Sequence, residues 1–142
     1  MSYNNVYAKS CVRAYNNTTQ AFTDALTPLT LKGVPVVESG CSLTLNTGSI
    51  RVNKSGLYHL SADVTFTPTA AGTATVQLYK DGVALPCAIS QWTVASGSTY
   101  TAHLETDLCL VTCCANHPII TLNISGVAGN VNHTCVGMCK LA

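Results

Sequence analysis

Apolar and polar residues alternate along several short stretches of this chain, with the period of two that is typical of a β-strand. The clearest stretch is residues 56–66, GLYHLSADVTF, in which every second side chain is apolar. This pattern predicts a strand with one face in a core and the other toward water. The apolar set is Tyr58, Leu60, Ala62, Val64 and Phe66, and the polar set is His59, Ser61, Asp63 and Thr65.

Turn-forming residues separate this stretch from further extended segments. The Asp81-Gly82 step is suited to a tight hairpin turn with positive φ. Asn46, Thr47 and Gly48 divide another pair of short strands. We therefore predict an all-β antiparallel sandwich of about eight to ten strands. Further strands are expected within residues 29–37, 98–114, 118–127 and 133–142.

Length and local composition indicate one domain with a short extension. A chain of 142 residues is the usual size of a single domain. Residues 1–20 are polar and rich in Asn, so we interpret them as an N-terminal arm and residues 21–142 as the folded domain. No apolar run approaches the ~18 residues of a membrane span, and the polar start lacks the apolar stretch of a secretory signal. We expect no membrane insertion.

The scarcity of charge changes the picture of the surface. Only 9% of the residues are charged and the net charge is +1, which argues against nucleic acid as a partner. A monomer normally exposes more charge than this. We therefore expect other subunits to cover part of the surface.

Two segments resemble a known superfamily. Residues 47–66 followed by residues 76–85 are similar to the central signature of the tumour necrosis factor and complement globular-head superfamily, which includes bacterial and phage members. The resemblance implies a ten-stranded jelly-roll sandwich whose subunits pack as a compact homotrimer. The residues that carry it are Gly48, Ile50, Gly56, Tyr58, Leu78, Lys80, Asp81 and Gly82.

Weaker similarity extends the resemblance to the end of the chain, with departures. Residues 103–111 are similar to the family's Leu-x-x-Gly-Asp-x-Val segment, with Thr106 at the Gly position and Asp107 retained. Residues 134–142 resemble its closing Phe-x-Gly-x-Leu strand. There Cys135 and Cys139 replace an aromatic and an aliphatic residue, and Gly137 is kept. The departures concern detailed packing and not topology.

The eight cysteines include three within DLCLVTCCANH, residues 107–117, a spacing that resembles a set of metal ligands. In a strand, however, Cys109 and Cys113 lie on one face and about 13 Å apart, at ~3.3 Å per residue, which is too far for one zinc or one disulfide. The other face is also apolar, so we predict that it contacts a neighbouring subunit at a trimer axis. This predicted interface consists of Leu108, Leu110, Thr112 and Cys114.

We favour an interpretation of the cysteines as small buried apolar side chains. The alternative is a set of cross-strand or intersubunit disulfides that join Cys109 or Cys113 to Cys135 or Cys139, a choice that the sequence leaves open. A metal site is the least favoured interpretation, and we expect neither a metal nor a cofactor.

Few residues are candidates for other chemistry. Glu105 and Asp107 share a strand face at roughly 7 Å, near the separation of a glycosidase pair. We interpret them as a solvated strand end, because no catalytic motif accompanies them. Trp92 and Tyr100 are candidates for a sugar-stacking surface, although packing in a loop is the favoured interpretation.

These features predict a non-enzymatic protein with no catalytic residues. Our leading hypothesis is a phage virion protein, a homotrimeric capsid decoration or head fibre that binds capsid or other virion proteins through its N-terminal arm. The alternatives are a fibre tip that binds a host receptor or surface glycan, or a bacterial cell-surface or spore-coat protein. A collagen-like stem would favour the last, and the sequence has none.

Overall fold

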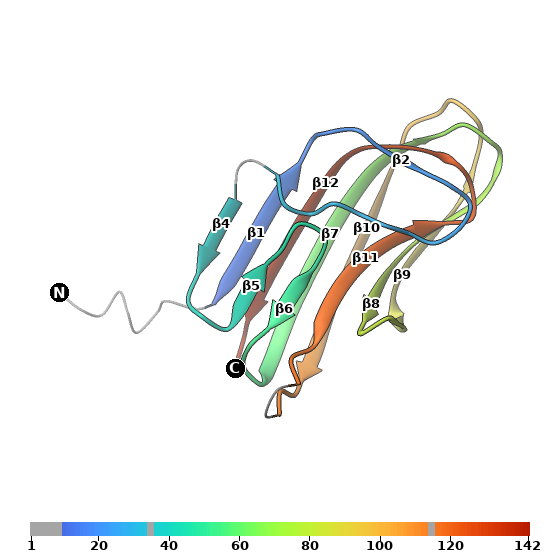
Figure 1. Cartoon of the computed structure of the whole chain (residues 1–142). Helices are drawn as coiled ribbons and strands as arrows, with labels where there is room; N and C mark the ends of the chain where they lie inside the picture. Colours follow the sequence, from blue (N-terminus) through green and yellow to red (C-terminus); the bar gives the residue numbers. More distant parts are fainter. Residues whose placement is uncertain (1–9, 34–35, 114–115) are drawn as a thin grey trace.

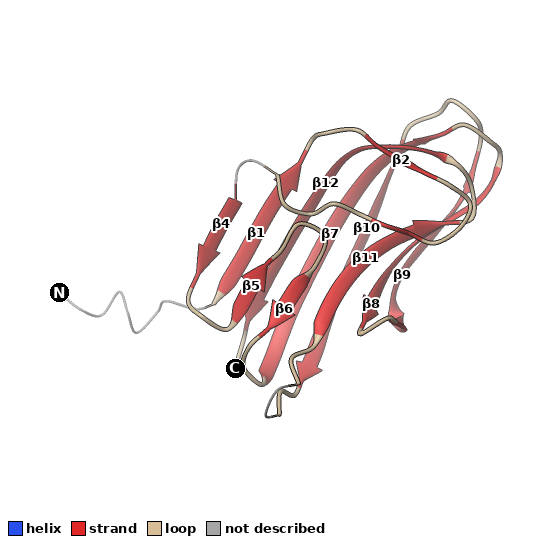
Figure 2. Ribbon diagram, viewed as in Figure 1, coloured by secondary structure: helices blue, strands red, loops and turns tan. Residues whose placement is uncertain are grey.

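The computed structural model of the chain is a two-layer β-sandwich, described here for residues 10–33, 36–113 and 116–142 (Figure 2). These ranges contain strands and no helix, so none of them holds a helix that could span a membrane. The strands are β1 (Cys11–Asn16), β2 (Gln20–Phe22), β3 (Thr27–Pro28), β4 (Val36–Ser39), β5 (Leu43–Leu45), β6 (Ile50–Val52), β7 (Gly56–Pro68), β8 (Gly72–Lys80), β9 (Val83–Val94), β10 (Tyr100–Leu110), β11 (Ile119–Ser125) and β12 (Gly129–Lys140).

The strands form two antiparallel sheets that pack face to face (Figure 1). Sheet A has the order β10-β7-β12-β1-β4, with β2 also paired to β12. Sheet B has the order β5-β6-β11-β8-β9, with β3 also paired to β11. The first and last strands of the sequence, β1 and β12, are therefore neighbours in sheet A. The predicted all-β antiparallel sandwich is confirmed.

Strand β7 shows why these residues form a sheet. The alternation predicted for residues 56–66 is confirmed, because the alternate apolar side chains from Tyr58 to Phe66 point into the core and the polar side chains between them point to the opposite face. The five predicted core residues are Tyr58 (0% exposed), Leu60 (0%), Ala62 (2%), Val64 (0%) and Phe66 (0%).

The hairpin predicted at Asp81-Gly82 joins β8 to β9. Both residues have positive φ, 51° for Asp81 and 80° for Gly82, as a two-residue turn between antiparallel strands requires. Farther along the hairpin the register shifts between Gln77 and Tyr79, and the extra residues of β9 include Pro86. Proline is tolerated there because a bulge in an edge strand needs no ladder hydrogen bond.

The predicted boundary between arm and domain at residue 20 is too late in the sequence. Strand β1 pairs with β12 along its whole length, and its side chains of Val12 and Ala14 are each 1% exposed in the core. Arg13 points out of the sheet, whereas Asn16 at the end of β1 is 6% exposed and donates from Nδ2 to the Thr30 carbonyl oxygen at 3.2 Å. Of the predicted arm, residues 1–9 lie outside the described residues.

We predict that Gly126→Ala destabilises the fold more than Gly97→Ala. Both glycines have left-handed φ, 100° and 85°, so an Ala costs about 1 kcal/mol at either position. At Gly126 an added Cβ would also collide with the Thr73 carbonyl oxygen, whereas nothing lies within 4 Å at Gly97. Overpacking adds about 1–3 kcal/mol. Urea unfolding of the two variants measures the difference, and equal losses would contradict the packing at Gly126.

Candidate functional site

The outer face of sheet A, the face turned away from the core, brings together histidine, carboxylate, cysteine and arginine side chains from four strands. Antiparallel registers place alternate side chains of β10, β7, β12 and β1 side by side on it. Because those strands are neighbours in the sheet but not in the sequence, the residues come from segments far apart in the chain. The face includes His103, Glu105, Asp107 and Cys109 of β10, His59, Ser61 and Asp63 of β7, Cys135, Gly137 and Cys139 of β12, and Arg13 and Tyr15 of β1.

Five of these residues form a continuous chain of contacts, which we name the histidine–carboxylate row. Asp63 Oδ1 lies 2.7 Å from Nδ1 of His103, whose Nε2 lies 3.4 Å from Oε2 of Glu105. The other oxygen of Glu105, Oε1, lies 2.9 Å from Nε2 of His59. Nδ1 of His59 lies 2.6 Å from Oδ1 of Asp107. Glu105 therefore bridges two imidazole rings, each of which also contacts a second carboxylate.

The row can be fully hydrogen-bonded only when it holds two extra protons. An ionised carboxylate only accepts hydrogen bonds, so each of the four contacts needs an N–H donated by a ring. A neutral imidazole has one N–H and an imidazolium has two. Both His59 and His103 must therefore be imidazolium for all four contacts to be hydrogen bonds.

The carboxylates raise the pKa of both rings. For His59 the largest cause is its hydrogen bond to Asp107, and Glu105 adds to it. For His103 the largest cause is its hydrogen bond to Asp63, again with a contribution from Glu105. Side-chain exposures from 37% to 60% keep the row in contact with water, so protons exchange freely with solvent.

The geometry of the row does not resemble that of a nucleophilic or glycosidase site. Both ring nitrogens of His59 contact carboxylates, which leaves none to activate the nearby hydroxyl of Ser61. Glu105 and Asp107 share a face of the strand, as predicted. The ring of His59 lies between the two carboxylates and contacts both, in the place where a glycosidase would bind the sugar. Among the described residues, no group of three or more His, Cys, Asp or Glu side chains is arranged to hold a metal ion.

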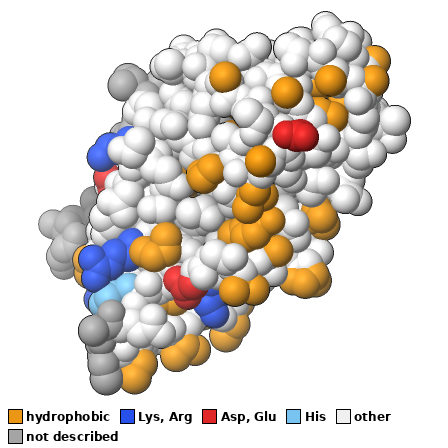
Figure 3. Space-filling view, turned by 45° about the vertical axis from the view of Figure 1, so that its right-hand side comes forward, with side chains coloured by type: hydrophobic (Ala, Val, Ile, Leu, Met, Phe, Trp, Pro, Cys, Tyr) orange, Lys and Arg blue, Asp and Glu red, His pale blue; other side chains and the backbone are white. Residues whose placement is uncertain are grey.

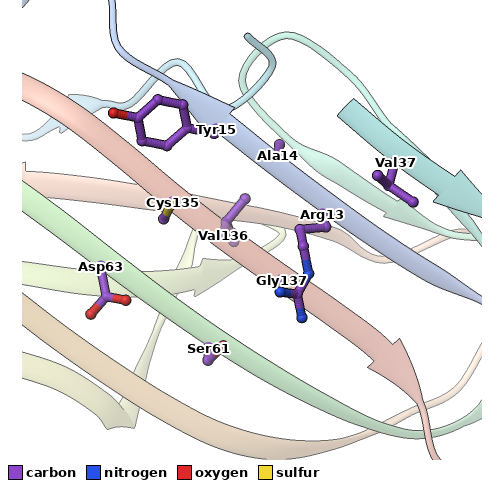
Figure 4. A pocket seen from close by; sticks show the side chains of 9 residues that line it. All are labelled: Arg13, Ala14, Tyr15, Val37, Ser61, Asp63, Cys135, Val136 and Gly137. Carbon is purple, nitrogen blue, oxygen red and sulfur yellow. The ribbon is translucent and has the colours of Figure 1, made fainter. Parts of the chain in front are cut away.

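A hollow of about 330 Å³ lies beside the row on the outer face of sheet A (Figure 4). It opens at Gly137, where the absence of a side chain leaves space between β7 and β1. In Figure 4 the Arg13 side chain extends over β12 at this glycine. Arg13 has no ion-pair partner within the described part of the chain. The lining is completed by Ala14, Tyr15, Val37, Ser61, Asp63, Cys135 and Val136.

The disulfide of the structure differs from the predicted pairings. Cys139 is bonded to Cys11, its register partner on β1, and not to Cys109 or Cys113. Cys135 lines the hollow as a thiol whose pKa is raised, chiefly by burial and further by Asp63. Four cysteines are exposed and Cys135 is only partly buried, so the predicted burial of the cysteines is wrong at these positions within one subunit. The exposed ones are Cys41, Cys87, Cys109 and Cys113.

The two faces of β10 lie opposite to the predicted assignment. Leu110 is 2% exposed in the core, and Leu108 packs against that core, so neither lies on the outer face of sheet A. The strand ends at Leu110, and Thr112 follows it with its amide donating to Ser55 Oγ at 2.8 Å. The fourth predicted interface residue, Cys114, lies outside the described residues. A trimer interface in this region stays a prediction, and the face of β10 left for it carries Cys109.

Trp92 and Tyr100 meet in the structure, where they extend an aromatic stack from the core. Tyr100 stacks on Phe66 with ring centroids 5.8 Å apart, and Trp92 tilts against Tyr100 at 6.0 Å. The Tyr100 hydroxyl accepts from the Ala95 amide at 2.8 Å, and Trp92 Nε1 donates to Ser90 Oγ at 3.0 Å. Both polar atoms are occupied, which favours packing at the β9–β10 corner. A sugar-stacking role stays a prediction.

The edge of sheet B formed by β9 is apolar and uncharged. Residues 82–104 contain no Asp, Glu, Lys or Arg. Within them, Val83, Ile89 and Trp92 are 68%, 40% and 38% exposed. Figure 3, which turns the right-hand side of Figure 1 toward the reader, shows separate clusters of hydrophobic side chains on that side, with a few charged groups among them. An exposed apolar edge of this length normally pairs with or packs against another chain.

Comparison with known proteins identifies the fold. No protein-family model and no curated protein matches the chain. Among solved structures, murine APRIL matches with 18% identity and a TM-score of 0.73, over 94% of this chain and 99% of that chain. Eiger TNF from S. frugiperda matches with 12% identity and a TM-score of 0.71, over 95% and 94%. The PRD1 vertex protein P5 matches with 16% identity and a TM-score of 0.65, over 95% and 99%. The jelly-roll fold of tumour necrosis factor-like proteins, implied by the sequence resemblance, is confirmed.

We predict that the folded chain loses stability as the pH rises from 6 to 8.5. The folded-state pKa values of His59 and His103 lie above the unfolded value of about 6.5. Their contribution is therefore complete below about pH 6.5 and is lost as the pH rises through the folded-state values. Urea midpoints in low-salt buffer measure the change. The double variant His59→Gln, His103→Gln should lose this pH dependence, and the control His117→Gln, outside the row, should keep it. The same change of urea midpoint with pH in the wild type and both variants would contradict a role of the row in stability.

We predict that removing the disulfide by Cys11→Ser together with Cys139→Ser lowers the free energy of unfolding by about 2–5 kcal/mol. The bond closes a loop with a sequence separation of 128 residues, so its loss frees a long segment of the unfolded chain. Cys41→Ser, at an exposed thiol, serves as the control. Non-reducing urea unfolding is the measurement, and dithiothreitol should destabilise the control but not the double variant. An equal effect of dithiothreitol on both would show that the bond contributes nothing.

Proposed function

We propose that this chain is a non-enzymatic structural protein of a phage virion, a homotrimeric capsid decoration or head-fibre subunit. The observation that carries the proposal is the match to the PRD1 vertex protein P5, which covers 95% of this chain and 99% of that one. The jelly roll therefore accounts for nearly the whole of both matched chains.

The chemistry of the surface supports a structural role. Both ring nitrogens of His59 already contact carboxylates of the row, and Trp92 Nε1 donates a hydrogen bond to Ser90 within the chain. The hollow beside the row has a lining that is largely apolar, with Arg13 and Asp63 as its charged members. Such a surface is suited to packing against protein.

Two different surfaces of the subunit support a closed ring of copies. The β9 edge is apolar and uncharged, and the outer face of sheet A is hollowed at Gly137. A ring of identical subunits forms when one surface of each copy packs against a different surface of the next. We place the β9 edge of one copy on the outer face of sheet A of its neighbour, in the homotrimer that the superfamily resemblance implies.

In this proposal the N-terminal arm, which consists of the residues before β1, attaches the subunit to the particle. The partners in this proposal are capsid or other virion proteins, and the location is the virion. The test is immunogold labelling of purified phage particles with antibodies against this chain. Labelled particles support the proposal, whereas label confined to the surface of uninfected cells or spores would favour the bacterial surface alternative.

We predict that Gly137→Trp abolishes the trimer and that Gly137→Ala retains it. A Cβ at this position would lie 3.9 Å from Ser61 Oγ and 4.0 Å from Arg13 Nη2, which are ordinary contacts, so the single subunit accommodates a side chain here. An indole would fill the hollow and exclude the neighbouring copy. Light scattering gives the mass, and circular dichroism confirms the fold of both variants. A trimeric Gly137→Trp protein would show that the outer face of sheet A is not the interface.

A further inference from the structure

The histidine–carboxylate row concentrates scarce charge at one place. The chain has six Asp and Glu residues and four His. Three of those carboxylates and two of those histidines belong to the row, on two adjacent strands. In a chain with so few charges, this concentration beside the hollow requires a physical explanation.

The charge of the row depends strongly on its protons. With neutral rings, Asp63, Glu105 and Asp107 give the row a net charge of −3, and with two imidazolium rings the net charge is −1. Arg13, which lines the hollow together with Asp63, brings the protonated face to neutrality. Two protons therefore convert a strongly anionic face into a nearly neutral one.

Within the described ranges, the strands beside the row supply no further positive charge that could replace the two protons. From β12, Cys135 faces Asp63 as a thiol, Gly137 faces Ser61, and Cys139, which faces His59, is in the disulfide. Tyr15 on β1 and His133 on β12 lie farther along, with ring centroids 5.6 Å apart. On the other side, β10 is the edge of sheet A and adds the thiol of Cys109. Apart from the histidines, Arg13 is the basic residue that these neighbouring strands bring to the face, within the part of the chain that the structure describes.

We propose that the outer face of sheet A is a proton-dependent interface for a second copy of this chain, which assembles when His59 and His103 are both protonated. The inference rests on the homotrimer of the proposed function. The surface assigned to meet this face, the β9 edge, is Val83–Val94, which contains no Asp, Glu, Lys, Arg or His and so offers no cation. Burying three uncompensated carboxylates against such a surface is unfavourable, whereas burying imidazolium–carboxylate pairs with all four hydrogen bonds made costs much less.

The direction of the effect follows from linkage. Assembly that requires protonated rings takes up protons, so it is favoured in mildly acidic solution and weakened as the rings lose their protons. The raised pKa values of His59 and His103, caused by their carboxylate partners, place this loss above pH 6.5. For each proton taken up per interface, the dissociation constant rises about tenfold per pH unit.

The test is a dilution series of the full chain at pH 6, 7 and 8.5, with the mass followed by analytical ultracentrifugation. For the wild type we expect the midpoint concentration for dissociation to rise at least about tenfold between pH 6 and 8.5. The double variant His59→Gln, His103→Gln should assemble weakly at every pH, because its three carboxylates stay uncompensated. His117→Gln, whose ring contacts the Val52 carbonyl oxygen outside the row, should behave as the wild type does.

A second variant protects the test against misfolding of the first. Glu105→Gln keeps the size of the side chain but removes the charge that joins the two rings, so we expect tighter assembly than wild type at pH 8.5 and a smaller pH dependence. A wild-type trimer with the same midpoint at pH 6 and 8.5 would overturn the inference and leave the proposed function standing. A chain that stays monomeric at every pH would overturn both.

Discussion

The strict alternation of β7 is the constraint on which the rest of the molecule depends. A slip of one residue in its pairing would turn every side chain of the strand to the opposite face. The apolar set from Tyr58 to Phe66 would then face water, and His59 and Asp63 would enter the core. Desolvating an imidazole and a carboxylate there is far more costly than leaving them outside. The same register that closes the core therefore also displays the row.

The core and the candidate interface consequently depend on the same strand. Strand β7 lies between β10 and β12 in sheet A, so it contributes alternate side chains to both faces of the sheet, away from the edge. On its inner side, close packing leaves few alternatives to the apolar residues that it carries. On its outer side, packing imposes little, and the residues are free to be selected for contact with other molecules. The hollow at Gly137 and the contacts of Glu105 lie on that second side.

The extent to which the sequence predicts this structure follows from the range of each interaction. The alternation in residues 56–66 and the Asp81-Gly82 turn are local, and both are confirmed. The histidine–carboxylate row was not predicted, because it requires the register of β10 on β7, between residues 40 to 48 positions apart in the chain. Spacing on β10 alone places Glu105 and Asp107 together but cannot supply the His59 ring of β7 that lies between them.

Nonlocal pairing also explains the two largest differences from expectation. The sequence of β1 indicates an arm, since its short apolar pattern becomes recognisable as a strand only through its pairing with β12. The partner of Cys139 was missed for the same reason, because Cys11 lies at the other end of the chain. The faces of β10 were exchanged because both carry apolar residues, and only the packing of Leu110 distinguishes them.

The bond between Cys11 and Cys139 has a mechanical consequence for a subunit tethered through its N-terminal end. Tension applied ahead of β1 reaches the sandwich at the first residue of that strand, where peeling of the β1–β12 ladder would otherwise begin one hydrogen bond at a time. The disulfide transfers the load directly to the last strand, β12, which lies at the centre of the sheet and pairs with β7. Detachment by unzipping is blocked, and the sheet must instead resist as a unit.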